Sequence, residues 1–132
     1  MTQPVVAFVA ALAVFCLCDF AWLGFIAKGF YQAQIGTLML DTPRWSAAAL
    51  FYPMYVAGIV FFCVAPALAQ GSWARALGLG VVLGLLAYGT YDLSNLATLK
   101  GWSVSLAVVD VLWGMAVTGA AATVGYLAAR AV

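Results

Sequence analysis

The amino-acid sequence predicts an all-α polytopic membrane protein, in which four transmembrane helices form an antiparallel bundle. Four apolar segments are each long enough to cross a bilayer, which requires about 20 residues. Of the 132 residues, 67% are hydrophobic and 7% are charged, whereas a soluble domain carries about 25% charged residues. The connections between the segments are short, which favours antiparallel neighbours. We therefore expect residues 1–132 to form a single transmembrane domain.

The first span is expected at about residues 4–27. No Lys or Arg precedes its apolar run, so we interpret it as a retained helix and not as a cleaved secretory signal. The following stretch, 30–40, is apolar and nearly uncharged. We expect a short interfacial helix or a loop there.

The second span is expected at about residues 43–70. Thr42 is the candidate N-cap, with Pro43 at the first helical position. Pro53 and Pro66 lie inside this span. Proline removes a backbone donor and kinks a helix, which membrane helices tolerate where neighbours satisfy the freed groups.

The third and fourth spans are expected at about residues 73–99 and 104–130. Ser72 and Ser103 stand directly before them as candidate N-caps, and Gly101 breaks the chain between them. Lys and Arg divide three to two between the two sides of the membrane. This difference of one charge is too small to fix the orientation.

Small residues recur at a spacing of four in the last two spans. Gly80 and Gly84 form one pair, and Ala121 and Gly125 form another. Such pairs allow helix backbones to approach closely. We interpret them as packing surfaces within the chain, with self-association as the alternative.

The composition excludes several classes of function. The net charge of +1 gives no basic surface for nucleic acid. The sequence contains no histidine, which removes the most frequent general base and the commonest metal ligand. Three cysteines in apolar segments are interpreted as buried thiols. The sequence therefore predicts neither a catalytic residue nor a metal site, and it identifies no cofactor.

Polar side chains interrupt the third span on one face. At 100° per residue, Tyr88, Tyr91, Asp92 and Asn95 fall on the same side of the helix. A carboxylate inside a membrane costs about 2.5–3.5 kcal/mol on insertion scales, so Asp92 must face protein or water. The neighbouring hydroxyl and amide groups can donate to it, and we expect this cluster to satisfy its own hydrogen bonds.

A second pattern, Asp-x-x-Trp, occurs in the first and fourth spans. Asp19 and Trp22 form one copy, and Asp110 and Trp113 form the other. Residues three apart share a helix face, and each indole supplies an N–H donor and a flat apolar wall. We expect these faces and a tyrosine pair of the second span to turn toward a common centre. The candidate ligand-binding or proton-relay residues are Asp19, Trp22, Tyr52, Tyr55, Tyr88, Tyr91, Asp92, Asn95, Asp110 and Trp113.

The same residues carry a resemblance to a known family. Four motifs carry it: D-x-x-W-L at 19–23, the Phe-Tyr pair at 51–52, YGTYDLSNLATLKGW at 88–102 and D-x-x-W-G at 110–114. Together they resemble a family of small bacterial integral membrane proteins, domain of unknown function 2177, over nearly the whole chain. The resemblance implies a multi-pass protein of the bacterial inner membrane and carries over no catalytic residue.

Three functions remain open from the sequence. The first is an aromatic and carboxylate-lined interior that binds or translocates a small amphiphilic or cationic ligand, or relays protons. A purely structural network is a poor explanation of three carboxylates, because interhelical hydrogen bonds in membranes average about 0.6 kcal/mol. The second is an accessory subunit of a larger membrane complex. The third, a lipid-modifying enzyme, is the weakest because no histidine is present. Expected partners are membrane lipid and a homo-oligomer or a larger membrane complex.

Overall fold

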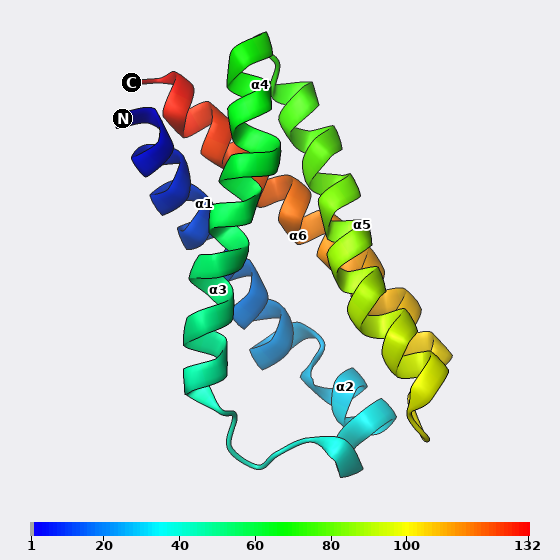
Figure 1. Ribbon diagram of the computed structural model, residues 1–132. Helices are drawn as coiled ribbons and strands as arrows, with labels where there is room; N and C mark the ends of the chain where they lie inside the picture. The colour runs from blue at the N-terminus through cyan, green and yellow to red at the C-terminus, as the bar shows by residue number, and fades with distance from the viewer. Residues whose placement is uncertain (1) are drawn as a thin grey trace.

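The computed structural model describes residues 2–132, and within this range four helices are long and apolar enough to cross a membrane. They are Thr2–Ile26, Trp45–Gln70, Trp73–Thr98 and Val104–Arg130. The predicted all-α polytopic fold is therefore confirmed. The N- and C-termini lie at the same end of the molecule (Figure 1). Large apolar side chains such as Phe25 and Phe61 are 87% and 71% exposed on the outer surface, as expected of a lipid-facing surface.

The first span consists of two helical forms. α1 (Thr2–Ala21) continues directly into a π-helical turn, Trp22–Ile26. The N–H of Ala27 donates to the carbonyl of Trp22 across 2.7 Å, the i→i+5 pattern of a π-turn. The expected short helix at 30–40 is found as α2 (Lys28–Ile35) followed by a 3₁₀ turn, Gly36–Leu38.

The second span also contains a π-helical turn. α3 (Trp45–Ile59) passes through Val60–Val64 into α4 (Ala65–Gln70). Pro66 lies in the first turn of α4, where its missing N–H is least costly. The expected start at Pro43 was wrong. Arg44 has an extended backbone (φ −82°, ψ 90°) and no side-chain cap forms, so the helix cannot begin before Trp45.

The last two spans begin at their predicted caps. Ser72 Oγ accepts from the Arg75 N–H at 3.1 Å and starts α5 (Trp73–Thr98). Ser103 Oγ accepts from the Leu106 N–H at 3.1 Å and starts α6 (Val104–Arg130). Each serine satisfies a backbone donor that the first helical turn leaves free.

α5 and α6 pack closely where glycines of the two helices face each other. A Cβ atom on Gly84 would overlap the backbone of Gly114, and one on Gly80 would lie 2.9 Å from the Cα of Gly119. A side chain at either position would push the helices apart. The interpretation of Gly80 and Gly84 as a packing surface within the chain is therefore confirmed.

The interior differs between the two ends of the molecule. Near the termini, Ala7, Ala11, Val64, Ala121 and Ala122 are all 0% exposed and fill the space between the helices. We call this end the closed half. At the other end, which contains α2, α3 diverges from α5 and α6 (Figure 1). We call that end the open half, and it contains the candidate site.

Candidate functional site

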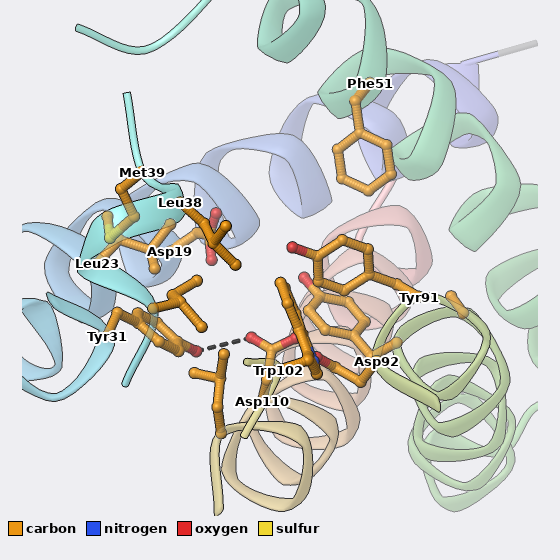
Figure 2. A pocket seen from close by; sticks show the side chains of 14 residues that line it. Asp19, Leu23, Tyr31, Leu38, Met39, Phe51, Tyr91, Asp92, Trp102 and Asp110 are labelled. Atoms are coloured by element: carbon orange, nitrogen blue, oxygen red, sulfur yellow. Dashed lines mark hydrogen bonds between the residues drawn. The ribbon is translucent and has the colours of Figure 1, made fainter. Parts of the chain in front are cut away.

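A cavity of about 620 Å³ occupies the open half between α1, α2, α3, α5 and α6. Its volume is in the range of small-molecule sites, about 300–1,000 Å³. Figure 2 shows the cavity with apolar and aromatic walls and with carboxyl groups that point inward. Its lining residues are Asp19, Leu23, Tyr31, Ile35, Leu38, Met39, Phe51, Ala87, Tyr88, Tyr91, Asp92, Trp102, Leu106 and Asp110.

Asp19, at the end of α1, has a hydrogen bond to each carboxyl oxygen. Tyr52 of α3 donates its hydroxyl to Oδ2, and Trp113 of α6 donates its indole N–H to Oδ1 at 3.2 Å. The side chain is 6% exposed. Asp19 therefore ties three helices together, and the two donors offset part of the cost of its burial.

The two Asp-x-x-Trp motifs are interlocked. The indoles of Trp22 and Trp113 stack in parallel, with ring centroids 4.5 Å apart and an interplanar angle of 5°. Trp113 reaches Asp19 directly. Trp22 Nε1–H donates to the Tyr31 hydroxyl at 3.0 Å, and Tyr31 in turn donates to Asp110 Oδ1 at 2.7 Å. The aspartate of each motif is thus reached by the tryptophan of the other.

Tyr31 of α2 is the bridge in this network. The side chain is buried, and burial, together with its hydrogen bond to Asp110 (Figure 2), raises the pKa of its hydroxyl. Tyr31 therefore keeps its proton and remains the donor to Asp110. The π-turn at Trp22–Ile26 sets where α2 begins, and so positions this tyrosine.

Asp92 of α5 is arranged differently. It is 0% exposed, and neither carboxyl oxygen has a hydrogen-bond partner within residues 2–132. Asp110 and Trp102 lie beside it, but neither completes a hydrogen bond of good geometry. The indole N–H of Trp102 is also buried without a partner in the described chain. A carboxyl group and an indole N–H, both buried beside the cavity, therefore lack hydrogen-bond partners within residues 2–132.

The expected self-satisfied cluster on the third span was wrong. Tyr88 is held against α6, because its ring lies over the backbone of Gly114. Tyr91 packs edge-to-face on Trp102, with centroids 5.5 Å apart and planes at 87°. Asn95 lies beyond the cavity lining. Sharing a helix face brought these residues near Asp92 without directing their donors to it.

The remaining predicted residues surround the cavity or lie outside it. Tyr52 and Trp113 donate hydrogen bonds to the Asp19 carboxyl group, and Trp22 donates to the Tyr31 hydroxyl, although none of the three lines the cavity. Tyr55 pairs with Thr118 Oγ1 at 2.9 Å, away from the lining. The sequence did not predict nine of the lining residues as site residues: Leu23, Tyr31, Ile35, Leu38, Met39, Phe51, Ala87, Trp102 and Leu106.

Some of these residues could have been found from the sequence. Trp102 ends the 88–102 motif and Phe51 belongs to the Phe-Tyr pair, so both stood in motifs already singled out. Tyr31, Leu38 and Met39 belong to a segment without periodic polar residues. Only the packing of α2 against α6 brings them to the cavity.

Membrane-length apolar helices around an interior that holds carboxyl groups define a polytopic helical membrane protein. The family model described as "Predicted membrane protein (DUF2177)" matches residues 4–127. The chain therefore belongs to this family, whose function is unknown, and the resemblance read from the motifs is confirmed. No curated protein and no solved structure matches the chain.

Proposed function

We propose that this membrane protein binds a small amphiphilic molecule taken from the bilayer. The polar end of the ligand would occupy the cavity beside Asp92 and Asp110. Its apolar part would extend between α3 and α5 to the lipid-facing surface. The observation that carries the proposal is Asp92, a fully buried carboxyl group without a hydrogen-bond partner in the described chain, at the wall of a cavity of about 620 Å³. Such a group is costly in a membrane unless a ligand or water pairs with it.

The distribution of polarity around the cavity supports an amphiphile. Phe51 on α3 and Tyr91 on α5 line the cavity and remain 40% and 53% exposed at the molecular surface. The cavity therefore communicates with the lipid-facing surface between these helices. Three aspartates, three tyrosines and Trp102 supply the polar groups of the lining. A molecule with one polar end and one apolar end matches this arrangement.

The connection between α2 and α3 supports access at the membrane surface. Leu38 and Met39 line the cavity although their segment lies outside the membrane-spanning helices. The site is thus near one surface of the bilayer, where lipid headgroups lie. From the family resemblance we infer that the membrane is the bacterial inner membrane.

The test is ligand retention by matched variants. The wild-type protein is purified in a maltoside detergent, and bound amphiphiles are identified by native mass spectrometry. Ala87→Phe places a ring in the cavity lining, whereas Ala97→Phe places one on an exposed position of the same helix outside the lining. We expect Ala87→Phe to lose at least about tenfold of the bound ligand and Ala97→Phe to retain it. Equal retention by both variants would contradict the proposal.

The other two functions remain predictions, and the same preparation distinguishes them. A stoichiometric second protein that co-purifies in mild detergent would favour the accessory subunit. A chemically altered lipid recovered from the purified protein would favour the enzyme. Uptake of the retained ligand into proteoliposomes would extend binding to translocation, and cross-linking in native membranes would reveal a homo-oligomer.

A further inference from the structure

We propose that the polar end of the ligand is an organic ammonium group, held by Asp92, Asp110 and the perpendicular rings of Tyr91 and Trp102. This inference rests on the proposed function and names the chemical class that the cavity selects. Figure 2 shows these four side chains gathered on one wall of the cavity.

The charge of the lining favours a cation. Three carboxyl groups line the cavity, and the lining contains no Lys or Arg within the described residues. All five basic side chains of the protein are exposed. The cavity therefore holds acidic groups that no positively charged side chain of residues 2–132 pairs with. A low-dielectric wall strengthens the attraction of such groups for a cation from outside.

The hydrogen bonds assign different roles to the three carboxyl groups. Both oxygens of Asp19 accept hydrogen bonds from Tyr52 and Trp113. Asp110 is engaged on Oδ1 by Tyr31, and Asp92 is free on both oxygens within residues 2–132. Asp92 is thus the carboxyl group most available to bind the ammonium group, and Asp110 is the second. Asp19 instead links three helices through its hydrogen bonds.

The aromatic geometry favours an organic cation over a metal ion. Tyr91 and Trp102 meet at 87° with centroids 5.5 Å apart, and form two walls of a corner. Ring faces attract ammonium groups through cation–π contacts, and aromatic cages of this kind recognise quaternary ammonium. A metal ion would need converging donor atoms, and no group of three His, Cys, Asp or Glu that could hold one is found in residues 2–132.

The test compares three probes with the same short alkyl chain. Hexyltrimethylammonium carries the cation, hexanol is neutral, and hexyl phosphate is an anion. Binding to the purified protein in maltoside detergent is measured by isothermal titration calorimetry. We expect the ammonium probe to bind at least about tenfold more tightly than hexanol, and the phosphate probe to bind more weakly than either.

Two variants locate the effect. Asp92→Asn keeps the shape of the side chain but cannot carry a negative charge, and it should weaken ammonium binding about tenfold or more while leaving hexanol binding unchanged. Asp41→Asn removes an exposed charge in the connection before α3, outside the cavity lining, and should change neither affinity. Trp102→Phe, which keeps an aromatic wall, should weaken ammonium binding less than Trp102→Ala.

The outcomes separate the two proposals. Equal affinity of the wild-type protein for all three probes, or ammonium binding that is insensitive to Asp92→Asn, would overturn the ammonium site and leave amphiphile binding intact. Binding of none of the probes, together with no retained amphiphile in the wild-type protein, would overturn both. Tighter binding of the phosphate probe would also overturn the ammonium site.

Discussion

The closed half and the open half of this bundle contain the same four membrane-length helices, but the helices pack differently in the two halves. In the closed half, alanine and glycine bring α1, α4, α5 and α6 into close contact, and buried residues such as Ala7 and Ala121 are fully covered. In the open half, α3 diverges from α5 and α6, and aromatic and acidic side chains line the space between them. α2 and the connection to α3 enclose part of the resulting space.

The difference shows how one chain combines rigidity with a binding space. Close packing at one end fixes the directions of the helices, since protein interiors are dense and resist deformation. The helices then separate toward the other end without losing their relative positions. In the open half, side-chain hydrogen bonds such as those of Asp19 replace backbone proximity as the link between helices.

Disrupting the glycine contact between α5 and α6 should cause the largest loss of stability. Gly84→Ala would place a methyl group into the backbone of Gly114, and we expect a loss of about 1–3 kcal/mol of unfolding free energy from overpacking. Gly78→Ala is the control on the same helix, because nothing lies within 4 Å of its Cβ position. It should gain about 0.5–1 kcal/mol from reduced chain entropy. Unfolding in detergent measures both, and equal effects would contradict the assigned contact.

Replacing carboxyl groups of the open half by amides should distinguish the structural role of Asp19 from that of Asp92. Asp19→Asn loses an acceptor for Tyr52 or Trp113 and should cost about 1–2 kcal/mol of stability. Asp92→Asn replaces a buried carboxyl group that has no hydrogen-bond partner in residues 2–132, and the stability of this variant should be unchanged or higher in the absence of ligand. Thermal unfolding of both variants at pH 7 tests this order. A larger loss for Asp92→Asn would mean that the Asp92 carboxyl group has a partner inside the protein.

Two tyrosine substitutions, one in each half, should change stability the least. Tyr31→Phe removes the link between Trp22 and Asp110 and should cost about 1 kcal/mol. Tyr126→Phe removes a hydroxyl that is buried in the closed half without a partner in the described residues. This change should stay within about 0.5 kcal/mol of the wild type. The same unfolding assay measures both, and a greater cost for Tyr126→Phe would reveal a missed hydrogen bond in the closed half.

The sequence by itself determined the fold class, the positions of the helices and the presence of polar groups in the membrane. Apolar length fixes the spans because each must cover the hydrocarbon core, and Ser72 and Ser103 fix two helix starts because a hydroxyl satisfies a free N–H. The glycine spacing predicted close packing. Each of these signals is local, since it depends on residues within a few turns of one another.

Only the tertiary structure decided which polar groups link helices to one another and which line the cavity without a partner in the described residues. Helical periodicity placed Tyr88, Tyr91 and Asn95 on the face of Asp92, but whether a donor reaches a carboxyl oxygen depends on rotamers set by other helices. Tyr31 comes to the cavity from a segment distant in the chain. The crossed pairing of the Asp-x-x-Trp motifs, and the lack of a partner for Asp92 within residues 2–132, follow from contacts between helices, which no single segment specifies.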